Sequence, residues 1–379
     1  MGSLYIHIPY CDTKCVYCDF YSIENHESKK EFLNSLLKEI SIVAQTYSKQ
    51  DIFETIFFGG GTPSLLSPNE LESILLSLNN NFTVSENAEI TLEANPGTVN
   101  LEKLKSYRSL GVNRISFGVQ SFHEDELKFL SRIHSVDQAR DAVNLSRKAG
   151  FDNLNIDLMF SLPKQTEQKL KYSLNEAFQL SPEHISAYSL IVEPNTPLFN
   201  LVKNKIVSPL PPDDDADLYK VTLEEMEKNG FHQYEVSNFC KSGFHSKHNS
   251  NYWNHSNYLG FGPSAHSFWK INPNNAKRWW NHRNITQYCN DISNGILPIT
   301  SSEQLTTKEL LQESLFLGFR SQGIEVKSFN KEYGFDIFTK YSSNINRYIQ
   351  ENLMMFENNM LRLTQQGYMV CDSISESFL

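Results

Sequence analysis

Short apolar segments alternate with longer amphipathic segments through the first half of the chain. Each short segment is rich in β-branched and aromatic residues and almost continuously apolar, which is typical of parallel strands buried on both faces of a sheet. The longer segments carry apolar residues at helical spacing. Six strands are predicted, at residues 4–9, 55–58, 89–94, 114–119, 154–160 and 184–191. Because right-handed crossovers join such strands, we predict an α/β fold with a partial (β/α)6 TIM-type barrel.

Helices are predicted between these strands and again in the second half of the chain. Gly111 and Gly150 provide natural stops for two of them. The predicted helices cover residues 29–48, 68–78, 101–110, 136–148, 167–179, 216–229, 306–319 and 345–356. Residues 234–280 show no clean period, and a short hairpin is predicted at 361–370 around Gly367. We therefore expect a barrel core at 1–200, a connector at 201–300 and a mainly helical, winged-helix-like accessory domain at 301–379.

Composition and charge exclude several classes of function. The chain has 34 Lys and Arg residues against 44 Asp and Glu residues, and its net charge of −10 disfavours a nucleic-acid partner. It has no run of about 18 apolar residues, so no membrane span is expected. Three of the six cysteines fall close together and the others are isolated, unlike a disulfide framework. With no leader visible at the first residues, we expect a cytoplasmic protein.

Three cysteines follow the first predicted strand directly. Cys11, Cys15 and Cys18 stand at positions i, i+4 and i+7, at the end of a barrel strand where active sites assemble. Three thiolates in one loop suit iron–sulfur clusters or zinc, but structural zinc sites close with a fourth ligand. His7 is the nearest candidate for that ligand, and three cysteines packed as small apolar side chains are the structural alternative. We favour a [4Fe–4S] cluster that leaves one iron open.

Polar residues follow the next four predicted strands. The Gly-Gly-Gly-Thr-Pro loop at 59–63 lets the backbone approach a ligand and frees its N–H groups, although a tight turn alone would also explain it. Glu93 and Gln120 end the third and fourth strands, where a barrel places functional side chains. Asp157 lies inside the apolar fifth strand and needs a partner, for which Arg132 is the obvious choice. A structural polar network at the barrel mouth is the alternative for each.

The cysteine spacing Cys-x3-Cys-x2-Cys resembles the signature of the radical S-adenosylmethionine (SAM) superfamily, in which the open iron binds the amino and carboxylate groups of SAM. The flanking residues, Tyr-Ile-His-Ile-Pro-Tyr at 5–10 and Asp-Phe at 19–20, are similar to the oxygen-independent coproporphyrinogen-III oxidase family, and within it to the HemW subgroup of proposed haem chaperones. The resemblance covers nearly the whole chain. It implies SAM contacts from nine residues: Tyr5, Tyr17, Gly60, Gly61, Thr62, Glu93, Gln120, Arg132 and Asp157.

Two positions depart from the family pattern. Ser161 and Asn195 each stand where the family usually has glycine. Asn tolerates left-handed backbone angles, so the change at Asn195 is mild, whereas Ser161 puts the shape of its loop in question.

Further features separate the haem-chaperone subgroup from the decarboxylases. The decarboxylases carry a fourth cysteine where this chain has Phe20, and a longer segment before the cluster, which begins here at Cys11. The sequence His-Asn-Ser-Asn-Tyr-Trp at 248–253 matches the His-Asn-x-x-Tyr-Trp motif of the HemW subgroup, which implies that His248 binds haem iron. Three other histidines lie close enough in sequence to compete for that role: His245, His255 and His266.

We therefore expect a haem chaperone that binds haem, carries a [4Fe–4S] cluster with exchangeable SAM, and transfers haem to an acceptor protein. An electron donor would be a further partner if radical chemistry occurs. The alternative is an oxygen-independent coproporphyrinogen-III oxidase (dehydrogenase), which decarboxylates propionates through a SAM-derived radical. A radical SAM enzyme acting on RNA is disfavoured because the net charge is −10 and no RNA-binding domain is visible.

Overall fold

Six parallel strands form the centre of the computed structural model, which describes residues 2–47, 51–272 and 274–379. They follow one another in the sheet as they do in the chain, each paired in parallel with the next. These strands are β1 (Gly2–Ile8), β2 (Phe53–Gly60), β3 (Val84–Ala94), β4 (Arg114–Gln120), β5 (Leu154–Phe160) and β6 (His184–Ser189). All six predicted strands are confirmed, and β5 has the predicted bounds.

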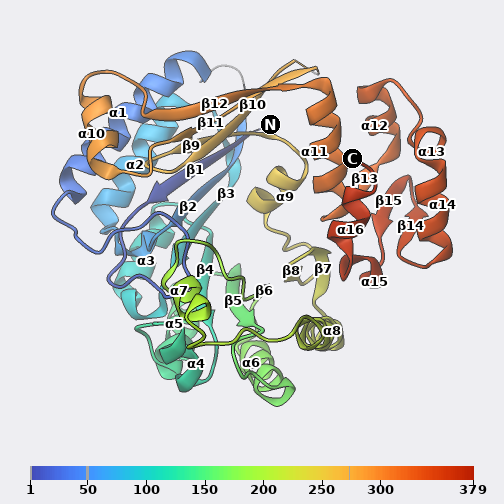
Figure 1. Cartoon of the computed structure of the whole chain (residues 1–379). Helices are drawn as coiled ribbons and strands as arrows, with labels where there is room; N and C mark the ends of the chain where they lie inside the picture. The colour runs from blue at the N-terminus through green and yellow to red at the C-terminus, as the bar shows by residue number, and fades with distance from the viewer. Residues whose placement is uncertain (1, 48–50, 273) are drawn as a thin grey trace.

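Helices follow these strands and lie in an arc along the outer side of the sheet (Figure 1). They are α1 (Lys29–Tyr47), α2 (Pro68–Asn81), α3 (Leu101–Ser109), α4 (Glu124–Phe129), α5 (Val136–Lys148) and α6 (Glu167–Gln179). The side chains of Ser67 and Ser135 accept hydrogen bonds from the first turns of α2 and α5, which fixes where these helices begin. Residue 48, the last of the first predicted helix, lies outside the described residues.

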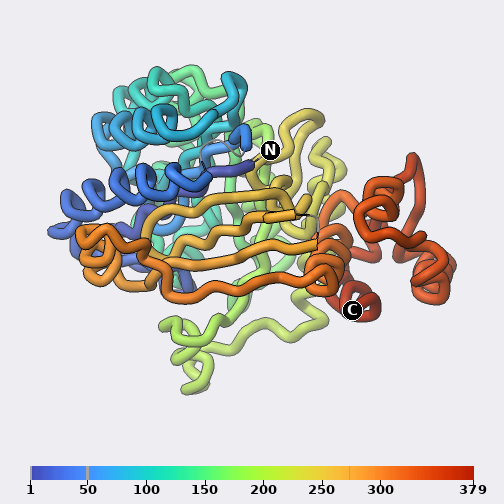
Figure 2. Tube along the Cα trace, turned by 90° about the horizontal axis from the view of Figure 1, so that it is seen from above, coloured from blue at the N-terminus to red at the C-terminus, as the bar shows by residue number. Residues whose placement is uncertain are grey.

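Among the described residues, six further strands extend the sheet at both edges. The full order is β12-β11-β10-β9-β1-β2-β3-β4-β5-β6-β8-β7, and β9 pairs with β1 in parallel. The added strands are β7 (His232–Glu235), β8 (Asn238–Cys240), β9 (Asn257–Phe261), β10 (His266–Asn272), β11 (Asn275–Asn281) and β12 (Ile299–Thr306). Figure 2 shows β9 to β12 side by side. Because β1 pairs with β9 and β6 with β8, the parallel strands form an open, partial barrel, as predicted.

Much of the segment 234–280, which has no clean period in sequence, therefore belongs to the sheet. The strands β10 and β11 form an antiparallel hairpin in which Phe268 lies opposite Arg278. Polar residues occupy the ends of both strands, and Lys277 and Arg278 adjoin the large apolar Trp279 within β11. The few large apolar side chains give too weak an alternation for the strands to be recognised from sequence.

The connector region contains four helices within the described residues. They are α7 (Pro197–Lys203), α8 (Pro212–Lys228), α9 (Lys247–Trp253) and α10 (Ile285–Ser293). The predicted helix at 216–229 begins earlier, at Pro212, because proline suits the first turn of a helix. Three aspartates follow in that turn, where negative charge is stabilised by the helix dipole. None of the helices in the described part of the chain is both long and apolar enough to cross a membrane.

The C-terminal region has an apolar cluster of its own, which includes Leu315, Ile337 and Leu361. Its helices are α11 (Thr307–Phe319), α12 (Val326–Tyr333), α13 (Ile337–Lys340), α14 (Ser342–Gln350), α15 (Gln365–Tyr368) and α16 (Cys371–Glu376). Three short strands form a separate sheet in the order β13-β15-β14: β13 (Ile324–Glu325), β14 (Met354–Glu357) and β15 (Met360–Leu363). Figures 1 and 2 both show these elements at one end of the molecule.

Two predictions for this region are wrong. The predicted helix at 345–356 is divided, since α14 ends at Gln350 and β14 follows it. The hairpin does not centre on Gly367, which lies in α15, but turns at Asn358 and Asn359 between β14 and β15. Both asparagines have positive φ, 51° and 66°, which is the backbone that tight two-residue hairpins require.

Candidate functional site

The cysteine loop starts where β1 ends and is closed at its base by backbone hydrogen bonds. The Ile23 N–H donates to the carbonyl oxygen of Pro9 at 2.7 Å, and the Cys11 N–H donates to that of Ile23 at 3.0 Å. Cys11 is buried, whereas Cys15 and Cys18 are half-buried. All three are free thiols. The loop therefore presents three cysteines from one segment anchored to the sheet.

The glycine loop after β2 packs against the cysteine loop. The Gly61 N–H donates to Ile8 O at 2.8 Å, and the Thr62 N–H donates to Tyr10 O at 2.7 Å. The Thr62 hydroxyl donates to Cys11 Sγ at 3.5 Å. A Cβ at Gly61 would lie 2.7 Å from Tyr10 O, so only glycine allows this approach. The expectation that these N–H groups stay free for a ligand is wrong, because they hold the cysteine loop.

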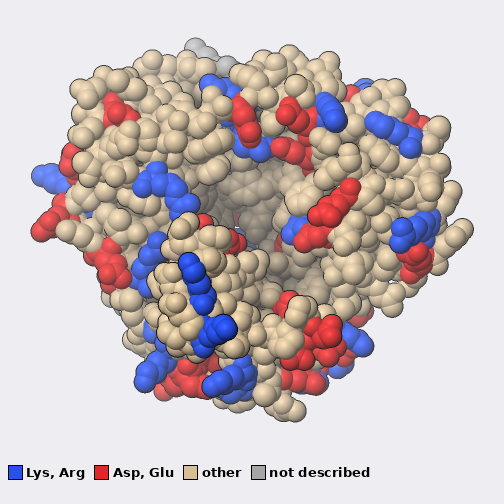
Figure 3. Space-filling model, in the orientation of Figure 1, with Lys and Arg blue, Asp and Glu red and all other residues tan. Residues whose placement is uncertain are grey.

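A cavity of about 420 Å³ opens beside the cysteine loop. Its wall contains the three cysteines and eight of the nine residues expected to contact SAM: Tyr17, Gly60, Gly61, Thr62, Glu93, Gln120, Arg132 and Asp157. The ninth, Tyr5, lines a separate, larger cavity, and its hydroxyl forms a hydrogen bond with His7 Nδ1 at 3.2 Å. Figure 3 shows the face in the orientation of Figure 1 hollowed near its centre, with acidic and basic side chains mixed around it.

Two carboxyl groups in the cavity wall have raised pKa values. Burial, together with the nearby carboxylate of Asp157, raises the pKa of Glu93 to about 8. Burial also raises the pKa of Asp157, although Asn155 donates to it at 2.6 Å and Ser116 at 3.3 Å. At neutral pH Glu93 is therefore largely protonated, and it can both donate to and accept from a hydroxyl group of a ligand.

Arg132 lies over the same cavity, but its contacts differ from the predicted ones. Its Nη1 donates to Cys15 Sγ at 3.4 Å, and its Nη2 donates to Gly118 O. Within the described residues its buried Nε has no hydrogen-bond partner. The predicted pairing with Asp157 is wrong, because the Asp157 carboxylate takes its hydrogen bonds from neighbours on β4, β5 and β6. Arg132 instead places a positive charge beside a cysteine of the loop.

Arg114 is a cavity residue that the sequence reasoning missed. It begins β4, its side chain is almost fully buried, and it lines the cavity. Its positive charge lies close enough to lower the pKa of both Glu93 and Asp157, against the larger effect of burial. The available signal was an arginine at the start of an apolar strand, which is the same signal that singled out Asp157.

The donor set suits an iron–sulfur cluster. Across residues 2–47, 51–272 and 274–379, no three His, Cys, Asp or Glu side chains converge as the ligands of a single metal ion would. A [4Fe–4S] cluster needs no such convergence, because each cysteine binds a different iron. The Thr62 hydroxyl and the Arg132 guanidinium already donate to cysteine sulfurs and would stabilise thiolates. The unpartnered Nε of Arg132 can donate to an anionic group of a bound cofactor.

His248 lies in α9, and the structure buries it against β2. Its Nδ1 lies 2.7 Å from Thr55 Oγ1, its Nε2 lies 2.8 Å from the Tyr252 hydroxyl, and its ring stacks on Phe57. Burial, with the nearby charge of Arg114, lowers the pKa of His248 to about 3. Both ring nitrogens are hydrogen-bonded, so neither is open to iron in this arrangement.

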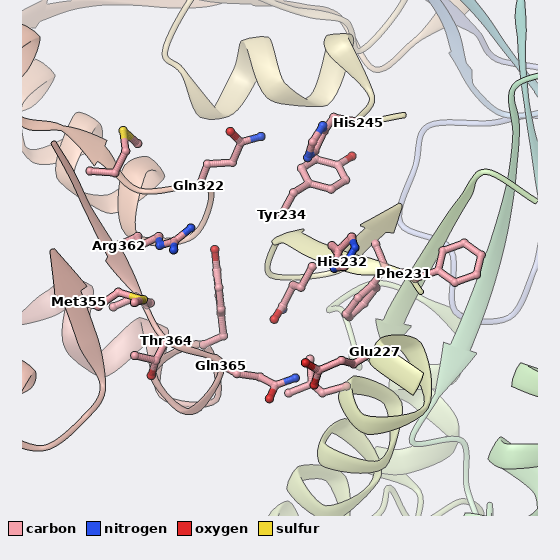
Figure 4. Close-up of a pocket in the computed structure, with 16 residues that line it drawn as sticks. Glu227, Phe231, His232, Tyr234, His245, Gln322, Met355, Arg362, Thr364 and Gln365 are labelled. Atoms are coloured by element: carbon pink, nitrogen blue, oxygen red, sulfur yellow. The ribbon is translucent and has the colours of Figure 1, made fainter. Parts of the chain in front are cut away.

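The three competing histidines occupy different sites. His255 Nε2 lies 3.0 Å from the Glu313 carboxylate. His245 meets Tyr234 edge to face in a cleft between β7 and the C-terminal region (Figure 4). His266 begins β10, and its exposed ring stacks on Trp280.

Both positions at which the family usually has glycine adopt left-handed backbone. The φ angle is 59° at Ser161 and 66° at Asn195. The Ser161 hydroxyl donates to the Asp215 carboxylate, which also accepts from Ser189 at 2.7 Å. The loop at Ser161 therefore keeps a glycine-like backbone, and its hydrogen bond offsets part of the strain.

Comparison with known proteins finds two matching family models and named relatives. Residues 5–177 match the family model of the radical SAM superfamily, and residues 305–370 match that of the HemN C-terminal domain. The chain is 37% identical to the heme chaperone HemW of Bacillus subtilis, over 100% of this chain and 99% of that protein. It is 41% identical to the heme chaperone HemW of Escherichia coli, over 70% of this chain and 69% of that protein.

A solved structure shares the fold. Coproporphyrinogen III oxidase (HemN) from Escherichia coli, a radical SAM enzyme, superposes with a TM-score of 0.83 over 100% of this chain and 89% of its own, at 20% sequence identity. Similarity at that identity speaks for fold alone. The full-length match to the Bacillus subtilis protein decides the family, and the cysteine loop, the accessory region and the histidine motif agree with it. The chain belongs to the HemW family within the radical SAM superfamily.

Proposed function

We propose that this protein binds haem and transfers it to an acceptor protein; its relatives in Bacillus subtilis and Escherichia coli are named heme chaperones. The observation that supports this most is the position of Phe20. This side chain is 65% exposed and lines both the cysteine-lined cavity and a second cavity of about 710 Å³. It offers a flat apolar surface to a porphyrin at the position where the decarboxylases of the resembling family carry a fourth cysteine.

We also propose that Cys11, Cys15 and Cys18 hold a [4Fe–4S] cluster and that the adjoining cavity binds SAM. The bound cluster would supply one-electron reduction. Glu93 would bind hydroxyl groups of the ligand, and Arg132 would bind its carboxylate through the free Nε. Gln120, at the end of β4, would complete the polar wall. The six free cysteines suit a reducing compartment, so we place this function in the cytosol.

The histidine motif gives a first candidate for the haem ligand. His248 would become available only if its hydrogen bonds to Thr55 and Tyr252 were broken, which requires α9 to move away from β2. Two such bonds contribute about 1 kcal/mol each. Haem binding would have to offset that cost.

An absorption titration tests the proposed function. The full chain, with its cluster reconstituted under anaerobic conditions, is titrated with haemin, and the Soret difference spectrum is followed. A saturable change that ends at a single haem per chain is expected. Haem that adds without saturation would contradict the proposal.

A further inference from the structure

The second cavity shares Phe20 with the cysteine-lined cavity. Its volume of about 710 Å³ falls within the roughly 300–1,000 Å³ typical of sites for small organic ligands and cofactors. Its wall comes from β1, the loop after the cysteines, α9, β9, β10, β11 and α11. Aromatic side chains are prominent in it, among them Phe20, Tyr21, Tyr258, Phe268 and Phe316. Such a wall suits a large planar apolar molecule.

Three histidines line this cavity, and within the described residues His266 alone has both ring nitrogens without a hydrogen bond or an ion pair. His7 bonds to Tyr21 O through Nε2 at 2.8 Å, and His255 contacts Glu313 and Ser314. His266 forms no side-chain hydrogen bond among the described residues, and its ring stacks on Trp280 with centroids 5.7 Å apart. Burial and the charges of two nearby arginines lower the pKa of His266, so its imidazole is neutral and carries a free lone pair at pH 7.

Two arginines line the same wall, together with the carboxylates of Asp19 and Glu313. Arg278 is already held by Glu303 at 3.0 Å and Glu313 at 2.5 Å. Arg283 is 56% exposed and uses one nitrogen, Nη2, on the backbone and carboxylate of Asp19. Its remaining N–H groups can donate to a carboxylate. An aromatic cavity with a free imidazole and an arginine that has spare N–H groups matches the three parts of haem: macrocycle, iron and propionates.

We propose that this cavity is the haem site, with His266 as the iron ligand and Arg283 as a partner of one propionate. The assignment rests on the proposed haem-binding function and deepens it. It places haem against Phe20, in the cavity next to the cysteine loop.

The cleft in Figure 4 is the strongest competing site, with a volume of about 590 Å³. His245 and Tyr234 lie on one side of it, and Met355 and Arg362 lie on the other. Its arginine pairs with Glu357 at 3.1 Å, and Glu227 adds negative charge to its wall. It shares no residue with the cysteine-lined cavity. His245 therefore provides a matched control: an exposed histidine at the wall of another cavity.

The test uses the reconstituted full chain and its His266→Ala, His245→Ala and His248→Ala variants, each titrated anaerobically with haemin. We expect His266→Ala to raise the Kd for haemin by about tenfold or more and to shift the Soret band, since an axial imidazole is lost. Added imidazole should restore the Soret band of His266→Ala. The His245→Ala variant should keep the Kd of the unchanged chain.

Two other outcomes would overturn either the assigned site or the proposed function. If His266→Ala keeps the Soret band and Kd while His245→Ala or His248→Ala loses them, haem lies elsewhere and the assignment fails. If the unchanged chain does not bind haemin, the proposed function itself fails. Circular dichroism shows whether each variant is folded, and the imidazole rescue separates a lost ligand from a damaged fold.

The propionate contact has its own test. Arg283→Gln should weaken binding of haemin by about tenfold or more, the loss expected for one charge-assisted hydrogen bond. It should leave binding of haem dimethyl ester, which lacks the carboxylates, unchanged. Arg347→Gln, at an exposed arginine of the C-terminal region, is the control. Equal weakening for haemin and its ester would overturn the role of Arg283.

Discussion

Replacing Gly61 by alanine should detach the cysteine loop from the sheet. A Cβ at this position would lie 2.7 Å from Tyr10 O, 2.9 Å from Ile8 O and 3.0 Å from Tyr10 N. All three are backbone atoms, which cannot turn aside as a side chain can. The overlap would therefore push apart the two segments that the Gly61 and Thr62 N–H groups join at 2.8 and 2.7 Å.

The magnitude follows from these contacts. Two lost hydrogen bonds cost about 2 kcal/mol together, and overpacking by a methyl group costs about 1–3 kcal/mol more. A local loss of about 3–5 kcal/mol is enough to populate loop conformations in which Cys11 no longer lies beside Thr62. We expect Gly61→Ala to reconstitute less than half of the iron bound by the unchanged chain.

The assay is the iron and sulfide content after anaerobic reconstitution, read together with the thermal midpoint. Gly97→Ala is the matched control, because a Cβ there would lie 3.7 Å from its nearest neighbour, an ordinary contact. Gly97→Ala should bind iron as the unchanged chain does. Full iron content in Gly61→Ala, with an unchanged thermal midpoint, would refute the reasoning.

Three further predictions concern the cluster, the cavity and turnover. Cys15→Ser should abolish cluster absorbance after reconstitution, whereas Cys240→Ser should retain it; equal absorbance in both would contradict the proposed ligands. Because folding raises the pKa of Glu93 to about 8, the folded state holds a proton that the unfolded chain has lost, and stability should fall as pH rises from about 5 to about 8. Glu93→Gln should reduce the pH dependence of the free energy of unfolding measured by urea denaturation. An unchanged pH dependence would contradict the role given to Glu93. With dithionite, SAM and coproporphyrinogen III, the reconstituted chain should form no protoporphyrinogen, and its formation would favour the decarboxylase alternative.

The elements that could be predicted most closely are those whose local signals agree. The fifth strand is mainly apolar, and the helices α5 and α6 begin at Ser135 and Thr166 caps, so sequence and structure give the same bounds. The added strands β9 to β11 could not be recognised, because they are joined to the sheet through β9, which pairs with β1, a contact between residues far apart in the chain. The position of these strands is therefore determined by pairing between distant segments and not by the local sequence pattern.

In the candidate site, too, some features could be predicted from sequence and others could not. Strand order alone brings residues at the ends of β1 to β5 to one cavity, which sequence reasoning anticipated. The sequence did not predict which side chains pair in this cavity. Arg132 contacts Cys15 and Gly118 rather than Asp157. The burial of His248 was hidden for a similar reason: its partners Thr55 and Phe57 come from a strand almost two hundred residues earlier.

The central claim is that one chain carries the cluster and haem together, in adjoining cavities that share Phe20. Native mass spectrometry of the reconstituted full chain, incubated with haemin under anaerobic conditions, tests it most directly. We predict a species whose mass equals the chain plus one [4Fe–4S] cluster plus one haem. Haem found only on chains that have lost the cluster would contradict it.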